Sequence, residues 1–146
     1  MSKQLAARSQ KIISARMVRS GGYWIATIWL SLGMVSTGLV QLLKGKDGQG
    51  GVDMITHLGY PVYFLTILGT WKILGAVAVL IPKFPLLKEW AYAGFFFMMT
   101  GAIFSHMAIG DTVSKMLPAL LLLILALLSW YLRPAGRKMI LTTFNK

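Results

Sequence analysis

Six polar side chains lie within, or at the ends of, long apolar stretches of this chain: Gln41, His57, Tyr63, Lys72, His106 and Asp111. Together they supply hydrogen-bond donors, hydrogen-bond acceptors and two imidazoles that can exchange protons. Polar groups in apolar surroundings must find polar partners, because leaving them unpaired is costly. We therefore expect these residues to be ligand-binding and to line a polar cavity around Lys72 that opens to the outer face of a membrane.

Lys72 is the most informative of the six. It lies near the centre of the apolar run 60–81, where a charge costs at least about 3 kcal/mol in a membrane. We expect its side chain to face the interior of a helix bundle, on a stripe shared with Leu65, Leu68, Gly69, Gly75 and Ala76. Its expected partners are backbone carbonyls, water, a bound anion, or hydroxyls such as those of Ser36, Thr70 and Thr100. The alternative is a structural lysine that is hydrogen-bonded between helices.

The other five residues are expected to gather at the outer mouth of the cavity, with Tyr60 and Asp53 nearby. The spacing of the two histidines and two aspartates matches no metal-binding motif, so we expect no metal site. A hydrogen-bonded polar cap or a cavity entrance fits better. Ser105 and His106 are adjacent, so they point in different directions on a helix, and no nucleophile motif is present. The residues do not favour an enzyme that acts alone.

Four apolar runs must position these side chains: 22–43, 60–81, 90–109 and 117–132. Each is close to the ~20 residues that a helix needs to cross a bilayer. The links between the last three runs are short, which makes those neighbours antiparallel. The predicted fold is therefore all-α: a polytopic membrane protein with an up-down bundle of four transmembrane helices.

The net charge of +11 is unevenly distributed along the 146 residues. Eleven lysines and arginines lie in residues 1–21, in the link between the second and third runs, and from Arg133 onward, whereas the other two links hold three. This bias predicts that both tails are cytoplasmic. It also predicts that the tails bind anionic lipid headgroups, and no nucleic acid partner is expected.

The chain divides into a basic tail (1–21), a transmembrane domain (22–134) and a second basic tail (135–146). Residues 1–20 fit either a basic amphipathic helix in the interface or a partly disordered tail. Residues 52–58 fit a short interfacial helix, Pro61 and Pro118 fit the first turns of the second and fourth spans, and Ser114 fits an N-cap. The chain has no cysteine, which excludes disulfides and thiol chemistry.

Several segments together resemble the DoxX-like family: His57–Pro61, Leu68–Lys72 with Gly75, Phe84–Tyr92, and Ser105–His106 with Gly110–Asp111. The resemblance covers roughly residues 22–134. It implies a four-helix protein of the bacterial inner membrane. Family members include subunits linked to thiosulfate–quinone oxidoreduction, and more distant members act in the assembly or trafficking of other membrane proteins.

Three functions remain open on the sequence. The first is a ligand-binding or accessory membrane protein that acts with a partner protein or a small amphiphile such as a lipid. The second is a membrane subunit of a quinone-linked oxidoreductase, in which Lys72 or His106 binds a quinone carbonyl. The third is a transporter, which would have to form a homo-oligomer because four spans are few. None of the three requires an intrinsic cofactor.

Overall fold

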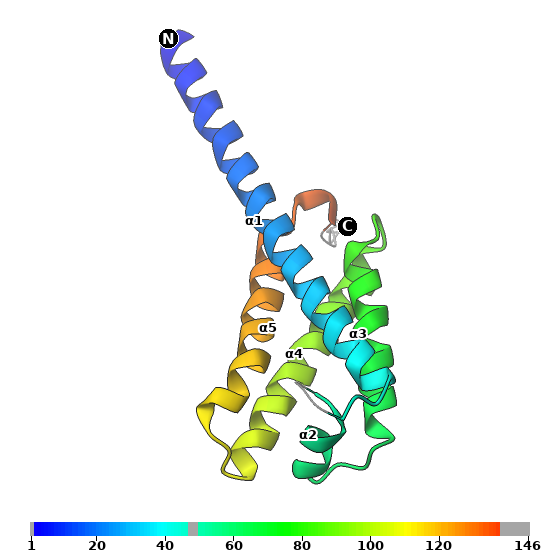
Figure 1. Ribbon diagram of the computed structural model, residues 1–146. Helices are drawn as coiled ribbons and strands as arrows, with labels where there is room; N and C mark the ends of the chain where they lie inside the picture. Colours follow the sequence, from blue (N-terminus) through cyan, green and yellow to red (C-terminus); the bar gives the residue numbers. More distant parts are fainter. Residues whose placement is uncertain (1, 47–49, 138–146) are drawn as a thin grey trace, which may run out of the picture.

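The computed structural model describes residues 2–46 and 50–137. It contains, in chain order, α1 (Ser2–Leu42), α2 (Val52–His57), α3 (Phe64–Leu80), α4 (Pro85–Ala108), α5 (Val113–Leu132) and the 3-10 turn η1 (Ala135–Arg137) (Figure 1). The described residues form no β-strand. The all-α prediction is confirmed, as is the short helix predicted over 52–58.

The four long helices form a closed ring. α1 packs against α3 and α5, and α4 packs against the same two helices. Successive long helices run in opposite directions (Figure 1), as the short connectors require. We name the two ends of this bundle by their elements. The α2 end holds α2 and the α4–α5 connector, and the η1 end holds η1 and the α3–α4 connector.

Three helices, α1, α4 and α5, are long and apolar enough to cross a membrane. α3 is apolar but has only 17 residues, which at 1.5 Å per residue gives about 26 Å, near the lower limit for a span. The predicted span 60–81 was too long at its start. Pro61 lies in a turn before the helix, where its carbonyl accepts a hydrogen bond from the Phe64 N–H.

Helix α1 runs without a break from Ser2 to Leu42. Its N-terminal turns extend beyond the bundle (Figure 1). Of the two alternatives for the basic tail, the structure therefore has the helix, and that helix continues directly into the first span. No proline occurs between residues 2 and 42, so nothing removes a backbone donor from this helix.

The fourth span also begins differently from the prediction. α5 starts at Val113 with Thr112 in the N-cap position, whereas the sequence predicted a start near 117 with Ser114 as N-cap. Pro118 consequently lies inside the helix rather than in its first turn. Proline is tolerated there because only the hydrogen bond to one carbonyl, that of Ser114, is lost near the helix start.

The interior of the bundle is closely packed where glycines let α1 and α3 approach. A Cβ atom added at Gly69 would lie 2.7 Å from the carbonyl oxygen of Gly38. This crossing turns one face of α3 inward, and Leu65, Gly69, Lys72 and Ala76 are all buried. Large apolar side chains such as Trp29 (64% exposed) and Trp71 (62% exposed) lie on the outside, as expected for a surface in contact with lipid.

Candidate functional site

A cavity of about 270 Å³ lies in the half of the bundle nearer the α2 end, and residues from all five helices line it. Most of its lining side chains are apolar. The polar lining residues are Thr37, Gln41, Tyr60, Lys72, Ser105, His106 and Lys115. An apolar cavity with a few convergent polar groups is typical of a small-molecule site.

Lys72 lies on α3, is 6% exposed and reaches this cavity. Its Nζ donates to Oγ1 of Thr37 on α1 at 3.3 Å. The three hydroxyls that the sequence suggested as partners make no hydrogen bond with Lys72. Each donates to a carbonyl of its own helix: Ser36, Thr70 and Thr100. A lysine ammonium has three N–H donors, so the single contact with Thr37 leaves capacity for a ligand.

Gln41 lies one helical turn beyond Thr37 and lines the same cavity. Its side chain is 4% exposed, and Oε1 has no hydrogen-bond partner among the described residues. Buried polar atoms are nearly always paired. An unpaired amide oxygen in a cavity lining therefore marks a place where a bound molecule can make a hydrogen bond.

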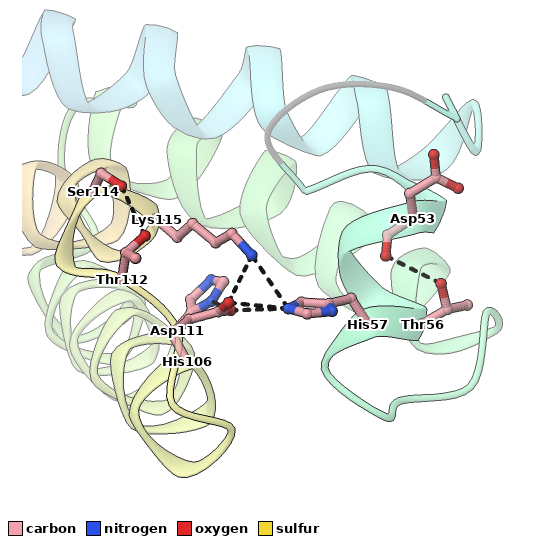
Figure 2. Close-up of polar contacts among 8 residues, drawn as sticks. All are labelled: Asp53, Thr56, His57, His106, Asp111, Thr112, Ser114 and Lys115. Atoms are coloured by element: carbon pink, nitrogen blue, oxygen red, sulfur yellow. Dashed lines mark hydrogen bonds and ion pairs between the residues drawn. The ribbon is translucent and has the colours of Figure 1, made fainter.

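At the α2 end, Asp111 is the centre of a charged cluster (Figure 2). Nδ1 of His106 lies 2.7 Å from Oδ2 of Asp111, and Nζ of Lys115 lies 2.6 Å from Oδ1. Nε2 of His57 lies 3.0 Å and 3.2 Å from the two carboxylate oxygens. Three elements contribute to the cluster: α2, α4 with the connector that follows it, and α5.

The three donors stabilise the charged form of the Asp111 carboxyl. Hydrogen bonds from Lys115, His106 and His57, in that order of effect, hold its pKa well below the usual range. The side chain of Asp111 is 8% exposed, whereas those of Lys115 and His57 are about half exposed. The carboxylate is thus enclosed by its partners and stays ionised at neutral pH.

The predicted site residues fall into three groups. Lys72, Gln41 and His106 line the cavity, and Asp111 and His57 join His106 at its mouth. Tyr63 is 66% exposed and is not among the lining residues. Asp53 and Tyr60 were both expected near the mouth, but the structure places only Tyr60 in the cavity lining. Asp53 is exposed on α2, whereas the hydroxyl of Tyr60 is 2.9 Å from that of Ser105 and both residues line the cavity.

Sequence reasoning missed Thr37 and Lys115 as parts of this site. Lys115 lies four residues after Asp111, and this spacing brings opposite charges together on a helical turn. That signal was available in the sequence. Thr37 shares a helix face with Gln41 by the same four-residue spacing, a pattern that favoured helix packing, but its position opposite Lys72 depends on how α1 and α3 cross. Within residues 2–46 and 50–137, no group of three or more His, Cys, Asp or Glu side chains is placed to hold a metal ion.

The η1 end contains a second polar cluster, centred on Lys88. In the sequence, Lys88 was only one of the basic residues in the link between the second and third apolar runs. Lys88 is fully buried, and its Nζ donates to the carbonyls of Ala78 (2.9 Å), Val79 (2.8 Å) and Ile81. The last carbonyls of a helix have no partner within that helix. Lys88 therefore caps α3 from the first turn of α4, and the tight connector between the two helices makes this contact possible.

Further polar contacts hold α5 in the bundle near the η1 end. Nη2 of Arg133 lies 2.6 Å from Oε1 of Glu89, so an ion pair joins the end of α5 to α4. Deeper in the bundle, the hydroxyl of Ser129 is 2.7 Å from those of Thr27 and Tyr92. The Ser129 hydroxyl thus connects α5 with α1 and α4. These contacts are structural in character, because each joins side chains of different helices, although Nη1 of Arg133 is buried without a hydrogen-bond partner among the described residues.

Comparison with known proteins agrees with the four-helix membrane architecture. Neither the curated proteins nor the solved structures include a significant match to this chain. The model of the DoxX-like family matches residues 25–129, more than two thirds of the chain. That range holds all of α2, α3 and α4, the second part of α1 from residue 25, and α5 up to residue 129. The protein is therefore a multi-pass membrane protein that belongs to the DoxX-like family.

Proposed function

We propose that this protein binds a small amphiphilic molecule from the bilayer, and that the head of the molecule contacts Lys72. The observation that carries the proposal is the position of Lys72, which is buried at the inner end of an apolar cavity with only Thr37 as a hydrogen-bond partner among the described residues. A buried lysine costs free energy unless its donors are satisfied. A ligand with hydrogen-bond acceptors at its head would satisfy them.

The shape and chemistry of the cavity support this proposal. Its lining is mostly apolar, Lys72 places a polar group at its inner end, and Gln41 lies one helical turn nearer the α2 end than Thr37. An amphiphile can match both parts, with its head at the polar groups and its tail along the apolar wall. The basic tails favour a topology with the η1 end in the cytoplasm of a bacterial inner membrane. In that topology the cavity and its charged mouth face outward.

A second candidate is a membrane subunit of a quinone-linked oxidoreductase. It is favoured by one observation, that Lys72 and His106 line the same cavity. Each side chain can donate a hydrogen bond to a quinone carbonyl. Electron transfer would require a partner protein with a redox cofactor, so this function predicts a stable complex with such a protein.

Native mass spectrometry of protein extracted gently from its own membrane tests the proposal. We expect a co-purifying amphiphile on the wild-type protein and its loss in Lys72→Met. Lys46→Met is a matched control, because Lys46 is exposed in the α1–α2 loop and is not among the cavity-lining residues. A bare protein in all three samples would contradict the proposal. A bound quinone together with a redox subunit would select the second candidate.

A further inference from the structure

The charge of the cavity lining narrows the class of ligand. Among the described residues that line the cavity, Lys72 and Lys115 are cations and none is acidic. The nearby carboxylate of Asp111 is already shared by Lys115, His106 and His57. It belongs to the mouth and makes no ion pair with Lys72, so the inner end of the cavity has a cation without a counter-ion among the described residues.

From this arrangement we propose that the ligand is a single-chain carboxylic acid, whose carboxylate lies between Lys72 and Gln41. The inference rests on the proposed function and specifies its ligand. A neutral head accepts hydrogen bonds from Lys72 but leaves the positive charge of Lys72 without an opposite charge in apolar surroundings. A carboxylate does both, because it accepts hydrogen bonds and supplies the opposite charge.

The groups at the inner end fit a carboxylate better than a phosphate. Lys72 has unused donors, Thr37 is beside it, and Gln41 lies one turn away on α1. The unpaired Oε1 of Gln41 is an acceptor, so it is the Nε2 amide group of this residue that can donate to a carboxylate oxygen. A phosphate monoester has more terminal oxygens and more charge. The part of the lining that the structure describes contains no arginine to meet them.

The size of the cavity fits one chain rather than two. Its volume of about 270 Å³ is below the roughly 300–1,000 Å³ of ordinary small-molecule sites. This space accommodates a compact head and the first part of one hydrocarbon chain. The rest of the chain must leave the cavity, and a two-chain phospholipid does not fit within it.

The exit for the chain lies between α3 and α4. Several lining residues are also exposed on the outer surface of the bundle, among them Phe97 (71% exposed) and Tyr60 (38% exposed). α3 and α4 also pack less extensively than the other neighbouring pairs of long helices. The hydrogen bond between Tyr60 and Ser105 bridges this opening near the α2 end. A fatty chain can therefore pass from the cavity into the surrounding lipid.

Equilibrium binding of radiolabelled laurate to the full-length protein in neutral detergent tests the inference, with unlabelled competitors of equal chain length. We expect laurate to compete at least about tenfold better than methyl laurate or dodecanol, the difference expected for one charge-assisted hydrogen bond. We also expect it to compete better than dodecyl phosphate. In Lys72→Met the preference for laurate over dodecanol should disappear, whereas Lys46→Met should keep it.

The outcomes separate the two proposals. Equal competition by laurate, methyl laurate and dodecanol would overturn the acidic class and leave the amphiphile site standing. Tighter binding of dodecyl phosphate would overturn the carboxylate assignment in the same way. Saturable binding by none of the four probes would contradict both proposals. The comparison among probes uses the wild-type protein, so it remains decisive even if Lys72→Met does not fold.

Discussion

His57 and Asp111 are 54 positions apart in the chain, yet Nε2 of the histidine lies 3.0 Å from Oδ1 of the aspartate. His57 ends α2, and Asp111 follows α4. Among the residues described, every side-chain hydrogen bond that joins α2 to another element involves His57. Met54 and Ile55 of α2 line the cavity. The contact between His57 and Asp111 thus holds a short helix across the mouth of the cavity.

Removing the charge of Asp111 should loosen α2. In Asp111→Asn the carboxylate that accepts hydrogen bonds from three side chains is lost, so we expect faster amide hydrogen exchange in residues 52–57 with little change in α3 or α5. Asp53→Asn is the control, because Asp53 is exposed on α2 and its side chain makes no contact with Asp111. Equal exchange in all three proteins would show that His57 does not hold α2.

The same cluster predicts a dependence on acid. The pKa of Asp111 is lowered in the folded protein, so its stabilising contribution is complete above the unfolded value of about 3.9 and is lost as the pH falls below it. We expect the wild type to have a higher melting temperature than Asp111→Asn at pH 7 and at pH 5. The difference should shrink below about pH 4. A difference that disappears between pH 7 and pH 5 would assign the effect to other groups.

Lys88→Met should destabilise the bundle. The substitution keeps the length of the side chain but leaves the carbonyls of Ala78, Val79 and Ile81 without their shared donor. Loss of a charged, buried hydrogen-bond partner costs about 2–3 kcal/mol, so we expect a clear fall in melting temperature measured by thermal unfolding in detergent. Lys83→Met, in the exposed connector, should change it little. An unchanged melting temperature in Lys88→Met would contradict its role as a cap for α3.

Gly69→Ala should also destabilise the protein, because the new Cβ would lie 2.7 Å from the carbonyl oxygen of Gly38 and 2.9 Å from Cγ of Leu42. Overpacking at such a site typically costs about 1–3 kcal/mol. Gly94→Ala is a matched control in α4, since a Cβ there meets nothing within 4 Å. That control should be neutral or slightly stabilising, because alanine favours a helix. Equal melting temperatures for the two variants would refute the close α1–α3 crossing.

Removing the hydrogen bond between Tyr60 and Ser105, which bridges the opening between α3 and α4, should speed ligand exchange. Tyr60→Phe removes the hydroxyl that contacts Ser105 and keeps the ring. Loss of one neutral hydrogen bond, about 1 kcal/mol, should raise the rate of laurate dissociation severalfold in stopped-flow displacement, with a smaller change in affinity. Tyr63→Phe is the control, because Tyr63 is exposed and lies outside the lining. Identical rates in the two variants would place the exit elsewhere.

Much of the architecture was readable in the sequence. Long apolar runs indicate membrane helices whatever lies beside them, because the cost of exposing backbone groups to lipid is local. The inward stripe around Lys72 could also be predicted, because residues three and four positions apart share one face of a helix. Helix ends were less predictable, because Pro61 lies in the turn before α3 and Pro118 lies inside α5, so a proline did not mark the first turn of either helix.

The tertiary structure alone decided which groups meet. Thr37, rather than Ser36, Thr70 or Thr100, contacts Lys72, because the crossing at Gly38 and Gly69 sets the rotation of α1 against α3. Asp111 lies between His106 and His57 because the α4–α5 connector and α2 come together at one end of the bundle. Hydropathy records how apolar a helix is, but the partners of its few polar side chains depend on rotation and crossing. Those are properties of the whole packed bundle.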